Sequence, residues 1–227
     1  MRNFTFLILS LSLFFACQNY SAKTTATTPT VEAEQMLLLQ KEVYDVPGMA
    51  MGLIKDGEVI YTGAHGLQGV GTQAPLTTKS LFHMASVSKP FVATAIVQLV
   101  EKGKVDLDEK LTHYLPYFKM ADEAYKDITI RQMLSHSSGI PDVDDYEWDK
   151  PQYDEGAAER FAKSVIDWDL DFVPGAEYSY SNTAFDILAN VIAKTSGMTF
   201  EAYMEENIFK PVGMVNSTFY KPDVPEA

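Results

Sequence analysis

Residues 83–102, HMASVSKPFVATAIVQLVEK, place two serines and a lysine at the start of an apolar run. From residue 86 to 102 nearly every face of a helix would be apolar, which predicts a buried central helix. Pro90 agrees with a helix that begins near Ser86, because proline is tolerated only in the first turn of a helix. We therefore expect the rest of the chain to pack around this segment.

The first chemical question is whether Ser86 is a nucleophile. On a helix, Ser86 and Lys89 lie on one face with their Cβ atoms roughly 5–6 Å apart, whereas Ser88 points about 100° away from Lys89. A lysine buried beside a serine loses hydration, which favours the neutral amine and lets it share in proton removal. The alternative is that Ser86 caps the helix and Lys89 extends into water. The pair alone does not decide between them.

A second polar group lies in residues 173–197, VPGAEYSYSNTAFDILANVIAKTSG, where Tyr180 and Asn182 precede a predicted helix. In an extended segment, residues i and i+2 project to the same side, so the phenol and the amide could line one wall of a pocket. A tyrosine whose pKa is lowered by a neighbouring ammonium can act as a general base toward a serine. The alternative is that Tyr180 lies in the core and Asn182 caps a helix at residue 183.

The N-terminus, MRNFTFLILSLSLFFA, carries one positive charge and then an apolar run that is too short to span a bilayer well, so residues 1–16 are predicted to be an export signal. The only cysteine, Cys17, follows, and residues 17–31 are a polar, Ser/Thr-rich segment typical of a flexible tether. The arrangement resembles a bacterial lipoprotein signal, with Cys17 as the lipidated residue. The alternative is ordinary secretion, with an incidental cysteine.

The chain has 31 acidic and 18 basic residues and a formal net charge of −13. Such a surface repels nucleic acid and anionic lipid headgroups, so a polyanionic partner is not expected. Contact with a membrane is expected only through a lipid on Cys17, which would place the protein in the cell envelope, on the periplasmic face or at the outer membrane. Without lipidation, a secreted or periplasmic protein is expected. The oligomeric state is not predicted by these patterns.

The remaining segments are mostly helical in pattern. Residues 32–42 predict a helix with Ala33, Met36 and Leu37 on its apolar side, and residues 49–66 predict a β-hairpin around Asp56-Gly57. A short helix is expected within residues 128–139, and further helices are expected at about 156–167, 183–195 and 199–208.

The acidic stretch from Asp142 to Glu155 is predicted to be a long exposed loop. A calcium site is the less favoured alternative, because the stretch lacks the glycine and the ligand spacing of a recognised calcium loop. Its aromatic residues Tyr146, Trp148 and Tyr153 could line the mouth of a site and select substrates.

Together these segments resemble the serine β-lactamase and penicillin-binding-protein superfamily, in its class C β-lactamase, D-alanyl-D-alanine carboxypeptidase and esterase branch. The resemblance covers nearly all of residues 32–227. It is carried by the order and separation of FHMASVSKPFVATAIVQLVEKGKVDLDEKLTHYLP (82–116), ITIRQMLSHSSGIPD (128–142), PGAEYSYSN (174–182) and FKPVGMVNSTFY (209–220). The Tyr-x-Asn form points away from class A enzymes.

The resemblance implies an α/β (α+β) fold of the β-lactamase/transpeptidase type, with an antiparallel sheet flanked by helices and a mainly helical subdomain. It makes Ser86 the acylated nucleophile, Lys89 its proton partner, Tyr180 the general base or acid, and Asn182 a ligand of substrate and lysine. His136 in HSSG is expected to pack or to hold its loop rather than to catalyse. No metal or organic cofactor is required.

The superfamily also uses a strand that carries Lys-Thr-Gly or His-x-Gly, and no such strand is evident here. KTSG, residues 194–197, is predicted to be a helix end, with Gly197 as its C-terminal cap. The two predicted strands also lack sheet partners, and an isolated hairpin is marginal in water. We therefore expect residues 32–227 to be the N-terminal part of a longer hydrolase domain, poorly active or unstable alone.

The leading functional hypothesis is an exported serine hydrolase that cleaves an amide, lactam or ester bond through an acyl-enzyme on Ser86. Its substrate would be a small molecule, a peptide or an ester. The sequence does not choose among a β-lactam, a peptidoglycan stem peptide, a D-amino-acid peptide and a simple ester. The rival hypotheses are a penicillin-recognising sensor or a catalytically silent cell-envelope binding protein on the same scaffold, and an inactive gene fragment.

Overall fold

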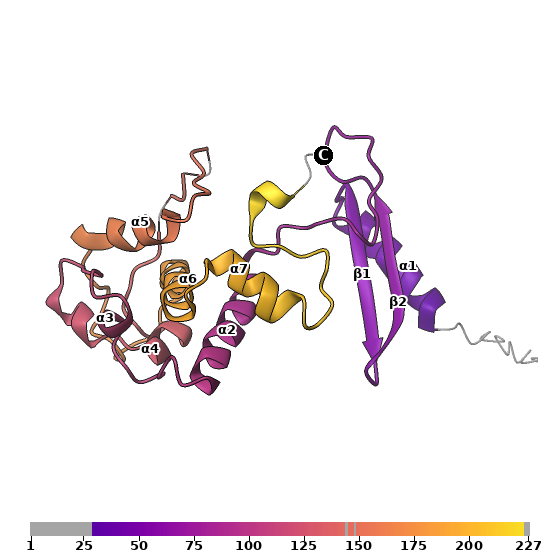
Figure 1. Ribbon diagram of the computed structural model, residues 1–227. Coiled ribbons are helices and arrows are strands. Elements are labelled where there is room, and N and C mark those ends of the chain that lie inside the picture. The colour runs from indigo at the N-terminus through magenta and orange to yellow at the C-terminus, as the bar shows by residue number, and fades with distance from the viewer. Residues whose placement is uncertain (1–28, 144, 148, 225–227) are drawn as a thin grey trace, which may run out of the picture. The chain divides into compact units, whose positions relative to one another are not determined.

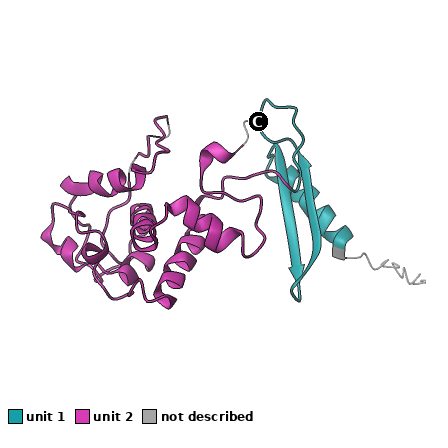
Figure 2. Ribbon diagram, in the orientation of Figure 1, with its two compact units in different colours: residues 1–78 teal, residues 79–227 magenta. Residues whose placement is uncertain are grey.

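The computed structural model describes residues 29–224 with the exception of 144 and 148 (Figure 1). The predicted export signal, Cys17 and most of the predicted tether lie outside the described residues. The chain divides into two compact units, residues 1–78 and residues 79–227 (Figure 2). Among the described residues, none of the helices combines the length and the apolarity that a bilayer crossing needs.

In the first unit, helix α1 (Pro29–Val43) packs against a two-stranded antiparallel sheet made of β1 (Gly48–Lys55) and β2 (Glu58–Gly66). The hairpin is confirmed: Asp56 and Gly57 form its two-residue turn with φ of +52° and +82°. Two positive φ values match the right-handed twist of the strands, and this is the reason that Asp-Gly is favoured there.

Helix α1 begins three residues before the predicted start at 32, inside the predicted tether. Of its expected apolar side, Ala33 and Leu37 are buried at 5% and 0% exposure, but Met36 is 56% exposed. A two-stranded sheet is narrow and covers only a narrow stripe of a helix, so the prediction for Met36 was wrong.

The second unit is built of helices and turns. Its helices are α2 (Lys89–Glu101), α3 (Leu111–Tyr114), α4 (Ile130–Leu134), α5 (Ala157–Ser164), α6 (Asn182–Ser196) and α7 (Phe200–Met204). Shorter 3-10 turns lie at η1 (Ala85–Ser88), η2 (Glu123–Asp127), η3 (Val165–Asp167) and η5 (Lys221–Asp223), and a π-helical turn, η4 (Glu205–Phe209), continues α7.

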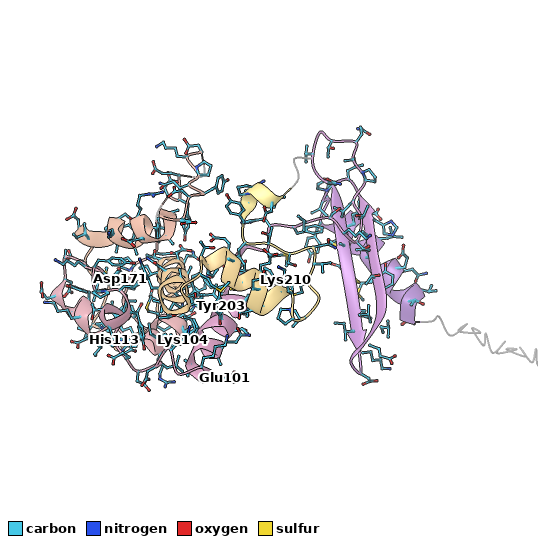
Figure 3. The ribbon with its side chains drawn as sticks, in the orientation of Figure 1. Glu101, Lys104, His113, Asp171, Tyr203 and Lys210 are labelled. Carbon is cyan, nitrogen blue, oxygen red and sulfur yellow. The ribbon has the colours of Figure 1, made fainter. Side chains whose placement is uncertain are left out.

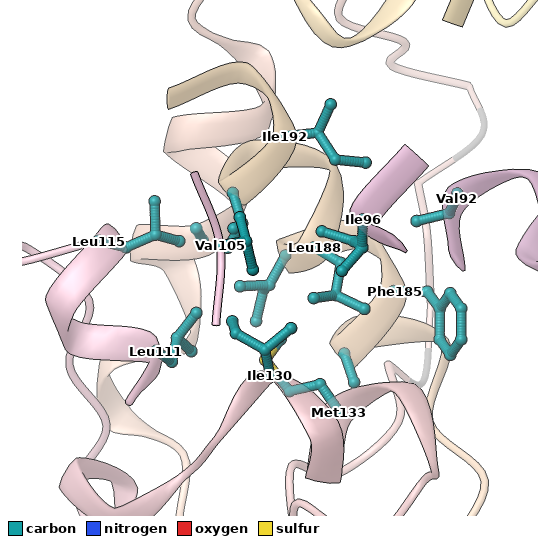
Figure 4. Packing of buried hydrophobic residues seen from close by; sticks show 14 of the residues in the cluster. Val92, Ile96, Val105, Leu111, Leu115, Ile130, Met133, Phe185, Leu188 and Ile192 are labelled. Carbon is teal, nitrogen blue, oxygen red and sulfur yellow. The ribbon is translucent and has the colours of Figure 1, made fainter. Parts of the chain in front are cut away.

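Helix α6 is the centre of this unit, because it contacts α2, α3, α4, α5 and α7. Ile187, Leu188 and Val191 are fully buried on it, and each such side chain contributes roughly 1.5–3 kcal/mol. Figure 4 shows Leu188 of α6 in one apolar cluster with Ile96 of α2 and Ile130 of α4. The apolar cluster therefore holds α6 and α2 as a common support.

The sequence predicted that helix α2 is buried on nearly every face, and this prediction was wrong. The helix buries Val92, Ala95, Ile96 and Leu99, whereas Val97 is 46% exposed. The buried residues follow the helical spacing of a single face that packs toward α6 and α7. Buried Tyr203 of α7, labelled in Figure 3, strengthens this contact, because its hydroxyl donates to Gln98 Oε1 of α2 at 3.2 Å.

Two predictions, one about the end of a helix and one about a loop, are confirmed. KTSG is the end of α6: Gly197 adopts φ +76° at the C-cap, and its N–H donates to the Ala193 carbonyl. Lys194, in the last turn, donates to Glu159 Oε2 at 2.7 Å. The described residues of 142–155 contain only turns and bends and are mostly exposed.

Candidate active site

The segment that presents Ser86 is a tight turn rather than the first turn of an α-helix. The α-helix begins at Lys89, and residues 85–88 form the 3-10 turn η1. Ala85 has φ +45°, a conformation that non-glycine residues rarely adopt and that costs on the order of 1–3 kcal/mol. The turn leaves Ser86 exposed at the surface, where a substrate carbonyl can approach its hydroxyl.

Lys89 meets Ser86 as its spacing predicted. Its Nζ donates to Ser86 Oγ at 3.2 Å. With three residues per turn in a 3-10 segment, side chains at i and i+3 eclipse one another, so the tighter turn brings the pair together as an α-helix would. Lys89 is half-buried, not buried as the sequence argument had assumed.

Tyr180 and Asn182 come to the same place from the start of α6. The intervening Ser181 is extended, with φ −135° and ψ 116°, so the two side chains point to the same side. Tyr180 Oη lies 2.6 Å from Ser86 Oγ, and Lys89 Nζ donates to Asn182 Oδ1 at 2.5 Å. The structure therefore brings all four predicted residues together.

The alternative roles of Tyr180 as a core residue and of Asn182 as a helix cap are excluded. Tyr180 is 40% exposed, so it is not a core residue. Ser181, not Asn182, caps α6: its Oγ accepts a hydrogen bond from the Ala184 N–H at 3.0 Å. The Asn182 side chain does not cap the N-terminus of α6 and instead contacts Lys89.

The pKa of Tyr180 is lowered from its ordinary value. Desolvation acts to raise this pKa, but the hydrogen bonds and the charge contributed by Lys89, together with the hydrogen bond to Ser86, outweigh it. The Lys89 Nζ lies 4.7 Å from the centre of the Tyr180 ring, which is within the range of a cation–π contact. A tyrosine with a lowered pKa is a better proton acceptor near neutral pH.

His136 holds the Tyr180 segment, in agreement with the structural role expected for it. Its ring stacks on Tyr180 with centroids 4.5 Å apart, and its Nδ1 accepts the Ser181 N–H at 3.2 Å. Its carbonyl oxygen accepts the Ser179 N–H at 2.9 Å. Desolvation, followed by the charge of Lys89, lowers the pKa of His136 and favours the neutral ring that can accept this hydrogen bond.

Sequence reasoning missed Asp142, which it assigned only to the start of the acidic loop. Asp142 Oδ1 accepts the Asn182 N–H at 2.8 Å, and Oδ2 accepts the Asn182 Nδ2–H at 2.9 Å. The signal available was an acid that ends the quoted segment 128–142. Nothing in its spacing links it to a residue 40 positions later.

The aromatic residues of the acidic loop have separate surroundings. Tyr146 donates to Asp186 Oδ2 at 2.9 Å, and Tyr153 packs edge-on against Tyr220 at a centroid distance of 6.2 Å. Trp148 lies outside the described residues. A role for these three in substrate selection therefore stays a prediction. Among the residues that the structure describes, no group of three or more His, Cys, Asp or Glu side chains is arranged to hold a metal ion.

The arrangement combines groups that nucleophilic acyl transfer can use: an exposed hydroxyl, a phenol and an ammonium within hydrogen-bonding reach of it, and an amide beside the ammonium. Comparisons with known proteins identify the family. The beta-lactamase family model matches residues 35–227. Penicillin-binding protein 4* of Bacillus subtilis is 34% identical over 173 residues, which cover 72% of this chain and 36% of that protein.

Two solved structures show the fold. The octameric penicillin-binding protein homologue of Pyrococcus abyssi matches with a TM-score of 0.73 and 28% identity, over 88% of this chain and 46% of that one. The D-amino acid amidase of Ochrobactrum anthropi matches with a TM-score of 0.67 and 28% identity, over 83% of this chain and 53% of that one. The predicted β-lactamase/transpeptidase-like fold is therefore confirmed, although the chain spans only about a third to a half of the length of these relatives. By these matches, the chain belongs to the beta-lactamase family.

Proposed function

We propose that this protein is a serine hydrolase that cleaves an amide, lactam or ester bond through an acyl-enzyme on Ser86. One observation carries the proposal: Ser86 Oγ lies 2.6 Å from Tyr180 Oη and 3.2 Å from Lys89 Nζ. A serine that merely capped a helix would not need two proton-transfer partners from separate segments. Nucleophilic catalysis does, because a hydroxyl is a weak nucleophile until a neighbouring group takes its proton.

In the acylation step, the Ser86 hydroxyl proton passes to the ionised oxygen of Tyr180 as Oγ bonds to the substrate carbonyl carbon. The tetrahedral intermediate then expels its amine or alcohol, which leaves with the proton from Tyr180. Water next attacks the ester on Ser86, giving up a proton to the same tyrosine, and the acid product departs as the proton returns to Oγ. Lys89 stabilises the phenol whenever it is ionised, which its lowering of the Tyr180 pKa supports.

The proposed substrate class rests on the relatives as well as on the site. One structural relative is an amidase for D-amino acids and another, the hydrolase EstCE1, is described as having promiscuous acyltransferase activity. Both activities form or cleave a bond at an acyl carbon. The Asn182 side-chain oxygen accepts a hydrogen bond from Lys89, and its NH₂ group still has a hydrogen that can donate to an acyl group of the substrate. We therefore propose a small acyl compound as the substrate, because both the activities of the relatives and the free Asn182 donor favour one.

The test is covalent labelling followed by intact-mass spectrometry. Wild-type protein treated with a fluorophosphonate or a penicillin should gain one adduct, and Ser86→Ala should gain none. Ser88→Ala is the matched control, because it removes a hydroxyl from the same turn. Labelling that survives Ser86→Ala would refute the assignment. An acyl adduct of penicillin that returns to free protein within minutes supports a hydrolase, whereas one that persists for hours supports the rival sensor or binding protein.

The cell-envelope location is a separate proposal. We infer export by residues 1–16 and lipid attachment at Cys17, from the apolar run and the position of this single cysteine. In a bacterial host, radioactive palmitate should label the wild-type protein, and Cys17→Ser should lose the label. Cys17→Ser protein recovered with unchanged lipid labelling would exclude a lipid at this position.

A further inference from the structure

Asp142 joins the acidic loop to the residues at the start of α6. Its Oδ1 accepts the backbone N–H groups of Asn182 at 2.8 Å and Thr183 at 3.4 Å, and its Oδ2 accepts the Asn182 side-chain Nδ2–H at 2.9 Å. The carboxylate thus does two things at once. It satisfies free N–H groups at the helix N-terminus, where a negative charge is favourable, and it contacts the side chain that binds Lys89.

Hydrogen-bonding rules allow only one orientation of the Asn182 amide between these neighbours. The Lys89 ammonium can only donate, so it must face the amide oxygen. The ionised Asp142 carboxylate can only accept, so it must face the amide nitrogen. Turning the amide over would set donor against donor on one side and acceptor against acceptor on the other.

The segment that carries Asp142 has a second attachment to the same helix. Tyr146 donates to Asp186 Oδ2 at 2.9 Å, and its ring stacks on Phe161 at a centroid distance of 6.5 Å. Asp186 lies four residues after Asn182, and residues at this spacing share a face of a helix. Asp142 and Tyr146 therefore contact positions that lie one turn apart on α6.

We propose that Asp142 is a positioning residue of the active site, whose carboxylate fixes the Asn182 amide so that its oxygen holds Lys89 against Ser86. The inference rests on the proposed function and adds to it. It also assigns the two hydrogens of Asn182 Nδ2: one is bound to Asp142, and the other is left to donate to the acyl group of the substrate. A displacement of catalytic groups by about 1 Å can lower a rate by roughly 100-fold.

Two substitutions separate orientation of the amide from capping of the helix. In Asp142→Asn, the new side chain keeps an oxygen for the backbone N–H groups but sets its own NH₂ against Nδ2 of Asn182. The Asn182 amide should then turn its oxygen away from Lys89. In Asp142→Ala the cap is lost, but nothing opposes the attraction between Lys89 and the amide oxygen.

The two variants are therefore expected to rank in one order for reactivity and in the reverse order for stability. Ser86 labelling by a fluorophosphonate should be fastest in wild type, slower in Asp142→Ala and slowest, by about 10- to 100-fold, in Asp142→Asn. Thermal stability should fall in the order wild type, Asp142→Asn, Asp142→Ala. Asp149→Asn, which removes the same charge from the same exposed loop, should match wild type in both measurements. Labelling rates that follow the stability order would overturn the proposal.

A double-mutant cycle tests the route of the effect. If Asp142 acts through the Asn182 amide, Asp142→Asn should slow Ser86 labelling less than about twofold further in the Asn182→Ala background. If the two residues act independently, the two reductions in labelling rate should multiply. Multiplicative effects would leave Asp142 as a helix cap only. Absence of Ser86 labelling in wild type would overturn the proposed function together with this inference.

Discussion

The phenolic oxygen of Tyr180 lies 2.6 Å from the hydroxyl oxygen of Ser86, across 94 positions of the chain. Ser86 sits on the turn before α2 and Tyr180 on the segment before α6, and these two helices pack against each other in one apolar cluster. Because both segments are attached to the same core, their distance is set by close-packed side chains. The packing thus fixes the separation of the two oxygens.

Tyr180→Phe should keep the ring that stacks on His136 but lose the oxygen that faces Ser86. We expect Ser86 acylation to slow by roughly 10²- to 10⁴-fold, which is the usual contribution of a general base. Tyr178→Phe is the matched control, since Tyr178 is 70% exposed and only its ring contacts His136. Stopped-flow measurement of acylation would check both variants, and equal rates for them would argue against proton transfer by Tyr180.

Lys89→Met should change the pH dependence as well as the rate. Lys89 lowers the pKa of Tyr180, so its removal raises that pKa toward the ordinary value. Activity that needs the ionised phenol is present above this pKa and is lost as the pH falls through it. The residual activity of Lys89→Met should therefore rise at a higher pH than wild-type activity does. Lys104→Met, at an exposed position, should leave the profile where it is; a common midpoint for all three proteins would contradict the coupling.

Asp186→Asn should stabilise the fold at neutral pH. Burial raises the pKa of Asp186 from 3.8 to about 6, so the folded state favours the protonated acid. This contribution is complete below about pH 3.8 and is lost as the pH rises through about 6. An asparagine oxygen can still accept from Tyr146 but carries no charge to desolvate.

Urea unfolding should therefore show Asp186→Asn more stable than wild type by about 1–3 kcal/mol at pH 8 and nearly equal to it at pH 3.5. The exposed Asp149→Asn serves as the control for a change in net charge. A stability difference that does not grow between these two pH values would show that Asp186 is ionised in the folded state without cost.

Gly139→Ala should be much more damaging than Gly103→Ala, although both glycines have positive φ. Gly103 has φ +66° with open space around an added Cβ, so only the backbone conformation costs, about 1–2 kcal/mol. Gly139 has φ +79°, and an added Cβ would lie 2.2 Å from the Phe172 carbonyl oxygen. We expect a loss of more than about 3 kcal/mol there, because overpacking adds to the backbone cost. Comparable denaturation midpoints for the two variants would refute the close approach of Phe172.

Local features of the chain were predictable because they depend on neighbours in sequence. The Asp56-Gly57 turn, the end of α6 at Gly197 and the meeting of Ser86 with Lys89 each follow from backbone conformations within a few residues. The prediction failed where burial was inferred from apolarity. Met36 and Val97 are apolar and exposed, because burial requires a second surface that periodicity does not reveal.

The convergence of Tyr180 and Asn182 on Ser86 and Lys89 was predicted from the resemblance, not from the spacing of these residues. Asp142 was missed for the same physical reason: its partner Asn182 is 40 positions away, and only the folded chain brings the two together. A hydrogen bond between distant segments forms only when the donor–acceptor distance is correct to within a few tenths of an ångström. Such distances are set by how α2, α4 and α6 pack.

The amino-acid sequence by itself determined the chemical groups and the local pairs at i+2 and i+3, since backbone geometry over a few residues is governed by local sterics and hydrogen bonds. The packing of α6 against its neighbours decided which hydroxyl meets which phenol, which carboxylate holds the amide and which apolar side chains stay at the surface. These contacts join segments that are remote in sequence, so they form only when apolar burial has already brought the segments together.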